Sequence, residues 1–341
     1  MNTTLAQDTS HGARRPRRLP GAATARLCLL ATTLVVLQSL TWLAVRVALD
    51  GTSTAIVSAG RVGFTVVALG LLTVNHRRTE SHAHDSQQHT GARPLRHWQA
   101  AALSVAGVSG YTALSTVAVQ VSGTLLPALI VSTGPLWVLV LVSLRRRSAP
   151  GRAKALGTLV AVVGGAFFLL AGSQGVHEVG ASSVLGTLLA VGAVLLMSVY
   201  TVAFAALTRG YQGPMAPVIT PIYAWGLAPL VVWALTDLLR GARLTPTTLA
   251  VLAALGLLVY LPVYLIQHRL LAEIGAHPVS LLGLAVSPLV AVETAGLGLG
   301  LWPSSLQWLA IAITLAGTAI VIGPRRRPKE SPSESPKDAT A

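Results

Sequence analysis

The segment "STGPLWVLVLVSLRRRSAPGR", residues 132–152, is an apolar run that stops at three consecutive arginines. A similar segment, "VSPLVAVETAGLGLGLWPSSL", spans residues 286–306 and places Pro288 153 residues after Pro135. This second segment contains no arginine and ends in Gly, Leu and Trp. The two segments therefore share an apolar pattern but differ in where positive charge lies.

The composition of the chain predicts its broad class. Hydrophobic residues make up 52% of the 341 residues and charged residues only 11%, and the mean hydropathy is +0.65. Soluble domains carry about 25% charged residues, so we expect an integral membrane protein. The net charge of +14 does not indicate nucleic-acid binding, because Lys and Arg occur in short blocks between apolar stretches. The single cysteine, Cys28, excludes an internal disulfide.

Ten apolar stretches have the length of about 20 residues that a helix needs to cross a bilayer. They are residues 26–48, 53–75, 98–119, 123–144, 153–172, 182–207, 215–237, 247–268, 278–300 and 304–323. Fusion of two spans at the tight junctions "VSG" (121–123) or "GLWPS" (300–304) would leave eight or nine crossings. The first run is too long for a signal-peptide core, so we expect it to be retained.

The positive charges predict the orientation of these spans. With a cytoplasmic N-terminus, all but four of the 25 Lys and Arg residues lie on the inner side; the exceptions are Arg46, Arg61, Arg240 and Arg243. We therefore expect a multi-pass protein of the cell membrane, plasma or inner, with both termini cytoplasmic.

An internal repeat accounts for the two opening segments. An offset of 153 residues aligns Tyr111 with Tyr264 and Gly164 with Gly317, as well as the two prolines. Equivalent spans are five apart, so the second copy enters the membrane from the opposite side, and only the cytoplasmic loop carries arginines. The predicted fold is all-α, with ten transmembrane helices in two inverted-topology five-helix repeats. The predicted parts are a basic tail (1–23), a first repeat (24–173) with a polar His-rich inner loop (76–97), a second repeat (180–323) and a disordered tail (324–341).

The stretches "SLTWLAVRVALDG", "SAGRVGFTVVALGLL", "VSTGPLWVLVLVSL" and "LLGLAVSPLVAVETAGLGLG" resemble the repeats of EamA-type permeases of the drug/metabolite transporter superfamily. The resemblance covers about residues 24–323. It implies a proton-coupled or passive carrier, often an exporter, for amino acids, other small metabolites or xenobiotics. One departure is that members commonly end spans 4 and 9 with Gly-Glu, where this chain has Leu144-Arg145 and Gly300-Leu301.

These features predict a transporter that works by alternating access, because inverted repeats are a common plan of secondary transporters. A membrane-embedded enzyme is an alternative, but the spans lack a Ser/His/Asp group, an HExxH motif or paired carboxylates. A receptor or assembly factor is a further alternative, which the near-absence of an extramembrane domain disfavours. We expect no enzymatic activity and no cofactor. The expected partners are lipid, a small-molecule substrate and protons. The expected oligomeric state is a monomer or a homodimer.

Two charged residues inside spans are candidate substrate-binding residues, because intramembrane ionisable groups are costly. Glu293 and Arg61 each lie roughly 10–12 Å below the same predicted surface, at 1.5 Å per residue. One interpretation is a charge pair that binds a zwitterionic substrate or breaks on protonation. The other is a structural ion pair, or a protonated glutamate bonded to a neighbour.

Four aromatic residues, Trp42, Tyr111, Tyr200 and Tyr264, are further candidate substrate-binding residues, since each combines a ring face with a polar group. Hydrogen bonding between helices or anchoring at the membrane interface would equally explain them. Pro135 and Pro288 are candidate hinges, because proline interrupts helical hydrogen bonding, although prolines are frequent in membrane helices.

A metal site is not expected. Five histidines gather in the inner loop, at His76, His82, His84, His89 and His97, and imidazole clusters can bind zinc. A metal carrier also needs His, Asp or Cys ligands inside its spans, and we identify none there apart from Glu293. The loop is therefore interpreted as solvated and disordered.

Overall fold

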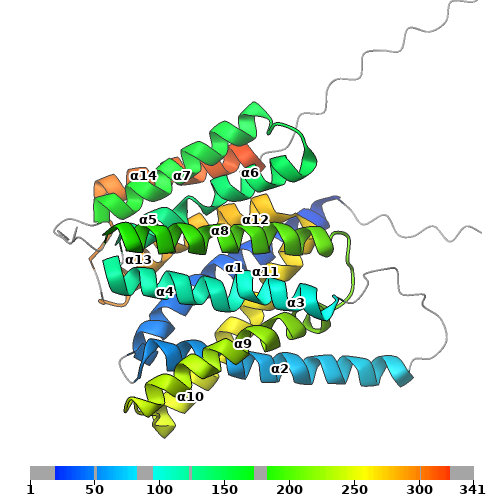
Figure 1. Cartoon of the computed structure of the whole chain (residues 1–341). Coiled ribbons are helices and arrows are strands. Elements are labelled where there is room, and N and C mark those ends of the chain that lie inside the picture. Colours follow the sequence, from blue (N-terminus) through cyan, green and yellow to red (C-terminus); the bar gives the residue numbers. More distant parts are fainter. Residues whose placement is uncertain are drawn as a thin grey trace, which may run out of the picture.

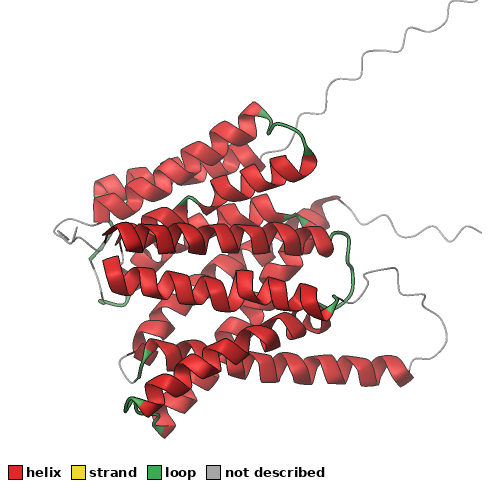
Figure 2. Ribbon diagram, in the orientation of Figure 1, coloured by secondary structure: helices red, strands yellow, loops and turns green. Residues whose placement is uncertain are grey.

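The computed structural model describes residues 20–49, 52–82, 95–122, 125–172, 183–299 and 301–322. The predicted C-terminal tail, most of the N-terminal tail and most of the His-rich loop lie outside these residues. Within them the chain forms helices joined by loops and turns, and no strand (Figure 2). The expectation of an all-α protein is thus confirmed for the described residues.

The helices are numbered in chain order (Figure 1). The α-helices are α1 (Pro20–Leu49), α2 (Thr54–His82), α3 (His97–Ser104), α4 (Gly110–Ser122), α5 (Leu125–Ser132), α6 (Gly134–Arg146), α7 (Arg152–Gly172), α8 (Ser183–Leu207), α9 (Ala216–Leu239), α10 (Pro246–Ala254), α11 (Leu261–Glu273), α12 (Ala276–Leu282), α13 (Val286–Gly296) and α14 (Ser305–Ile322). Two π-helical segments, η1 (Val105–Ser109) and η2 (Leu255–Tyr260), join α3 to α4 and α10 to α11, and a 3₁₀ turn, η3 (Gly283–Ala285), joins α12 to α13.

Nine helical segments in the described residues are long and apolar enough to cross a membrane. The tenth expected span, 304–323, corresponds to α14, an apolar helix whose length alone leaves it out of that group. Its start is fixed by a capping box, in which Ser304 accepts a hydrogen bond from the Gln307 amide and the Gln307 side chain accepts one from the Ser304 amide. Pro303 directly precedes this cap.

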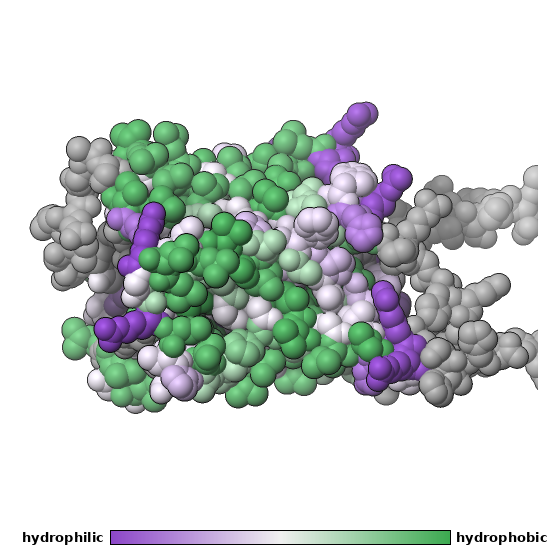
Figure 3. Space-filling view, turned by 60° about the horizontal axis from the view of Figure 1, so that its bottom comes forward, coloured by the Kyte–Doolittle hydropathy of each residue, from purple (hydrophilic) through white to green (hydrophobic). Residues whose placement is uncertain are grey.

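The surface is that of a protein surrounded by lipid. Large apolar side chains such as Leu71, Leu188 and Leu258 are exposed on the flanks of the bundle. Figure 3 shows hydrophobic residues over most of the visible flank, with hydrophilic ones gathered toward its two ends. An apolar flank of this extent would be a liability in water and is stable against hydrocarbon.

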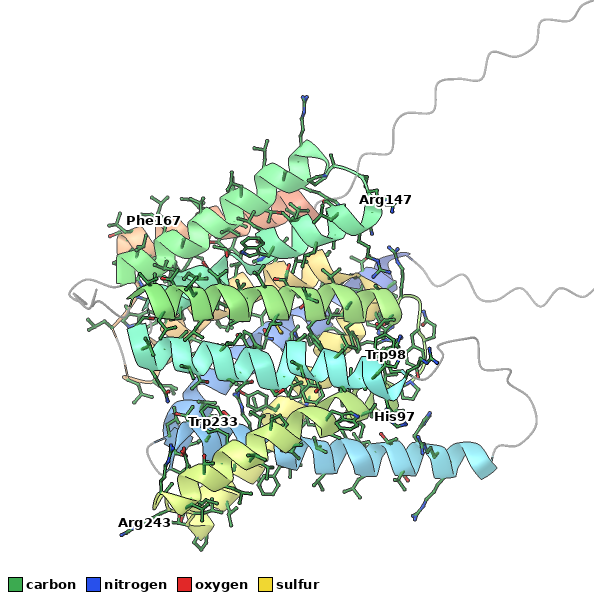
Figure 4. The ribbon with its side chains drawn as sticks, in the orientation of Figure 1. His97, Trp98, Arg147, Phe167, Trp233 and Arg243 are labelled. Atoms are coloured by element: carbon green, nitrogen blue, oxygen red, sulfur yellow. The ribbon has the colours of Figure 1, made fainter. Side chains whose placement is uncertain are left out.

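The two ends of the bundle differ in their landmarks. His97, Trp98 and Arg147 lie at one end, here named the Arg147 end (Figure 4). Phe167, Trp233 and Arg243 lie at the other, here named the Trp233 end (Figure 4). Helix α1 begins and α14 ends at the Arg147 end, and α14 begins at the Trp233 end (Figure 1).

Both helices that carry the candidate hinges are interrupted. Pro135 follows the break at Thr133 between α5 and α6, and Pro288 lies in the first turn of α13, which follows the 3₁₀ turn η3. A proline cannot donate a backbone hydrogen bond, and its ring clashes with the carbonyl four residues earlier. For Pro288 that carbonyl belongs to Leu284, which lies within η3. The interruptions expected from the sequence are present; their use as hinges stays a prediction.

Three glycines let α7 and α14 pack backbone to backbone. A Cβ atom on Gly317 would lie 2.3 Å from the amide nitrogen of Ala161 and 2.6 Å from the carbonyl oxygen of Gly157. A Cβ on Gly164 would lie 2.6 Å from the amide nitrogen of Thr314. Small residues of this kind drive close packing in membranes, where the hydrophobic effect does not.

Gly317→Ala is therefore expected to destabilise the protein, because its methyl group meets backbone that no rotamer change can move. The expected result is a lower apparent Tm and a lower yield of monodisperse protein in detergent. Gly70→Ala is the matched control, since a Cβ at Gly70 of α2 has nothing within 4 Å. An unchanged Tm for Gly317→Ala would show that α14 is not held against α7 as described.

Candidate functional site

Arg61 lies in α2 and is half-buried within the bundle. Its Nη1 donates a hydrogen bond to the hydroxyl of Tyr260 in η2, and its Cζ lies 4.8 Å from the centre of the same ring. The buried Nε has no hydrogen-bond partner among the described residues. None of the ion pairs among the described residues includes Arg61. The Arg61 guanidinium is thus held by the uncharged side chain of Tyr260, and its Nε–H has no acceptor among the described residues.

Two further tyrosines, from α4 and α11, lie near this guanidinium. Tyr264 of α11 and Tyr111 of α4 both interact electrostatically with Arg61. The ring centres of Tyr260 and Tyr264 are 5.4 Å apart, and those of Tyr264 and Tyr223 of α9 are 4.3 Å apart. The first distance falls within the range of favourable aromatic packing, and the second lies just below it. We name Arg61, Tyr111, Tyr260 and Tyr264 the Arg61 cluster.

The aromatic packing continues to a buried histidine. His268 of α11 lies edge-on to Phe204 at a ring-centre distance of 4.5 Å. Its Nδ1 lies 2.6 Å from the carbonyl oxygen of Tyr264, and its Nε2 is hydrogen-bonded to the hydroxyl of Tyr200. Since a carbonyl only accepts, Nδ1 carries the proton; a neutral imidazole then accepts from the Tyr200 hydroxyl at Nε2. Tyr200 and His268 are 2% and 1% exposed, so this bond is shielded from solvent.

Tyr200→Phe is expected to destabilise the protein by about 1–3 kcal/mol, because it leaves the buried His268 nitrogen without a donor. The apparent Tm in detergent measures this effect. Tyr264→Phe is the control, because the Tyr264 hydroxyl makes no hydrogen bond to a described residue. Equal losses in the two variants would argue against a specific role for the Tyr200–His268 bond.

Glu293 of α13 forms a separate site with α1. Its Oε1 lies 2.7 Å from the hydroxyl of Ser39, and its Oε2 is buried with no hydrogen-bond partner in the part of the chain that the structure describes. The same hydroxyl lies 2.8 Å from the carbonyl oxygen of Val36. A serine has one proton for these two acceptors. An ionised Glu293 competes with Val36 for it, whereas a protonated Glu293 donates to Ser39 while Ser39 donates to Val36.

The hypothesis of an Arg61–Glu293 ion pair is wrong for this structure. Glu293 is bonded to Ser39 of α1, and Arg61 to Tyr260 of η2. The sequence gives the depth of each residue in the membrane, but not the direction in which each helix face points. Two groups at one depth can therefore turn to different neighbours.

The structure brings most of the other candidate residues together. Arg61, Tyr111 and Tyr264 share one cluster, and Tyr200 joins it through His268. The side chain of Trp42 lies outside the described residues. Tyr223, Tyr260, His268 and Ser39 were not expected from the sequence. The spacing of Tyr260, Tyr264 and His268, each four residues apart, places them on one helix face and is a signal that could have identified them.

The metal expectation needs one correction. Glu293 is not the only residue of a metal-ligating type in the spans. His268 lies in the Pro246–Glu273 segment and His277 in the Ala276–Gly296 segment. His277 Nε2 lies 2.9 Å from the Thr158 hydroxyl. No group of three or more metal-ligating side chains is found in the part of the chain that the structure describes.

A cavity of about 620 Å³ lies at the Trp233 end. It is walled by the end of α1, the start of α2, the end of α4 and the end of α9. Its lining residues are Leu49, Thr52, Ser53, Thr54, Ala55, Ala113, Val117, Gln120, Trp233, Asp237 and Arg240. Thr54 and Arg61 are seven residues apart on α2, nearly two turns, so they share a face. Arg61 thus lies roughly 10 Å deeper than the cavity wall along one helix face.

Polar contacts join several elements at the Arg147 end. Glu273 at the end of α11 binds Arg26 of α1 at 3.1 Å and also Arg269. Arg269 donates to the carbonyl oxygens of Tyr211 and Gly213 in the α8–α9 loop. Arg269 and Glu273 are 18% and 17% exposed, so solvent screens this network only in part. It ties α1, α11 and the α8–α9 loop together.

Comparison with known proteins gives a match at the level of fold. No protein-family model matches the chain. No curated protein matches it. A solved structure described as "Crystal structure of protein" has a TM-score of 0.67 and 19% sequence identity, over 87% of this chain and 96% of its own. At this identity, the similarity shows that the two chains share a fold.

Proposed function

We propose that this multi-pass membrane protein is a carrier that exports small metabolites or xenobiotics by alternating access. The observation that carries the proposal is the matching of structural irregularities between the two halves. Each half has a π-helical segment in its third span and a helix interruption before the proline of its fourth span. Gly164 and Gly317, equivalent in the proposed repeat, both lie in the α7–α14 interface, Gly164 against Thr314 and Gly317 against Ala161.

The helix packing supports two halves of opposite orientation. Helix α7 packs on α14 and α2 on α9, and each of these pairs joins equivalent spans of the two halves. Helix α8 packs on α4 and α6, and α1 packs correspondingly on α11 and α13. Such an arrangement allows two similar bundles to exchange conformations around a shared site.

The ends of the bundle support an outward-facing conformation. Arg147 and the described chain ends lie at the Arg147 end, which we place in the cytoplasm. That end is tied by the Glu273 network, whereas the cavity lies at the Trp233 end. In this proposal the Glu273 contacts break and the cavity closes when the protein changes to its inward-facing conformation.

Glu293 is proposed as the group that couples export to protons. Its bond to Ser39 joins α1 of the first half to α13 of the second. Because one serine proton serves two acceptors, protonation of Glu293 reverses the bond across that interface and frees the Ser39 hydroxyl to donate to Val36 within α1. A change in bonding between moving elements is what a proton-driven switch requires.

The test is a metabolite comparison between cells that express the wild-type chain and cells that express Arg61→Ala, with surface expression matched. A carrier changes the distribution of a compound between cells and medium but leaves its total unchanged. A membrane-embedded enzyme changes the total. A solute identified in this way is then measured for flux in proteoliposomes, where a lack of flux would contradict the proposal.

A further inference from the structure

We propose that the Arg61 cluster is a binding site for the carboxylate of an organic acid with one negative charge and an aromatic body. This inference rests on the proposed function and names the substrate class of that carrier. It does not depend on an amino group in the substrate.

The free edge of the Arg61 guanidinium carries the first step. Nη1 is used by Tyr260, whereas neither Nε nor Nη2 is hydrogen-bonded to a described residue. The Nε–Nη2 edge presents two parallel N–H groups, which is the geometry that binds a carboxylate in bidentate fashion. A cation inside a helix bundle with no counter-ion among the described residues is costly, so an anionic ligand would relieve that cost.

The surroundings of Arg61 select the charge of the ligand. The cluster holds one cation and three neutral tyrosines, and the described ion pairs bring no carboxylate within 4.0 Å of it. A monoanion would neutralise this charge, whereas a dianion would leave a second buried charge unpaired. A cationic ligand would meet repulsion without a counter-ion.

The tyrosines select the body of the ligand. Tyr264 and Tyr111 are half-buried and so keep accessible surface, while Tyr260 is buried against Arg61. Their rings offer flat apolar area beside the guanidinium, and their hydroxyls offer donors near the carboxylate. An aromatic ring fits such a surface by offset or edge-on stacking.

The position of the cluster gives the ligand a route. Arg61 shares a face of α2 with Thr54 in the wall of the 620 Å³ cavity. That volume is in the range of pockets for small organic molecules. A small acid in the cavity therefore lies about two helical turns from the guanidinium.

The test measures equilibrium binding to the full chain purified in detergent. Its probes are 3-phenylpropanoate, phenylalanine and 2-phenylethylamine, which share one body and differ in charge. We expect saturable binding of 3-phenylpropanoate to the wild type and no measurable binding of 2-phenylethylamine. Arg61→Ala is expected to weaken the binding of 3-phenylpropanoate at least tenfold. Arg61→Lys keeps the positive charge but loses the two parallel N–H groups. It is expected to weaken 3-phenylpropanoate binding less than Arg61→Ala does.

Arg209→Ala, at an exposed arginine after α8, is the matched control and is expected to bind as the wild type does. The apparent Tm without probe confirms that each variant is folded. Three results would overturn the inference: tighter binding of the amine than of the acid, unchanged acid binding by Arg61→Ala, or binding of phenylalanine without 3-phenylpropanoate. If the protein transports another solute but does not bind 3-phenylpropanoate, only this inference is wrong. If it binds 3-phenylpropanoate but transports no solute, only the carrier proposal is wrong.

Discussion

Arg61→Ala is expected to lower transport of the exported solute roughly 30-fold or more, because truncation of one partner of a buried, hydrogen-bonded charge pair costs about 2 kcal/mol or more. In this account the second partner is the substrate carboxylate, and Tyr260 holds the guanidinium in place. Initial rates of efflux in proteoliposomes measure the effect. Arg209→Ala at equal protein density is the control.

A double variant separates this account from an ion-pair account. If Arg61 served mainly to neutralise Glu293, then Glu293→Gln would partly restore the activity of Arg61→Ala. No such rescue is expected, because each side chain has its own partner, Tyr260 for Arg61 and Ser39 for Glu293. Restored flux in the double variant would show that the two charges meet during transport.

Glu293→Gln is expected to make flux insensitive to an imposed pH gradient. In the wild type, an acidic medium at the Trp233 side should accelerate efflux, because protons arriving from that side protonate Glu293. A glutamine amide donates to Ser39 much as a protonated carboxyl group does, so the variant remains in one bonding state. The measurement is efflux from proteoliposomes across a pH series on each side of the membrane.

Ser39→Ala provides the comparison for that result. This variant keeps the titratable carboxyl group but removes the hydroxyl whose hydrogen bonds change when Glu293 is protonated, so the pH dependence of flux should be reduced. A pH dependence that survives in Glu293→Gln would place the coupling group elsewhere and leave Glu293 a structural residue.

Much of the fold could be predicted from the sequence because lipid imposes strong rules. A bilayer requires long apolar helices, which explains why the spans were identifiable, and the prolines located both helix interruptions. The length of α14 was less predictable, because Pro303 and the Ser304–Gln307 capping box set where this helix begins.

The candidate site was only partly predictable, for a geometric reason. Arg61 and Glu293 stood out because buried charges are rare in membrane helices. Their separate partners depend on how α2 and α13 are rotated, which the depth of a residue does not give. The Ser39–Glu293 contact joins residues 254 positions apart, and no spacing in the sequence points to it. The Tyr260, Tyr264 and His268 face, by contrast, follows from helical periodicity alone.

The central claim, that two similar halves span the membrane in opposite directions, is tested most directly by cysteine accessibility. Single cysteines at Ser148 and Leu301, both exposed, are introduced after Cys28→Ser and labelled with an impermeant maleimide from either side. The account predicts labelling of position 148 only from the cytoplasmic side and of position 301 only from the outer side. Labelling of both positions from the same side would contradict it.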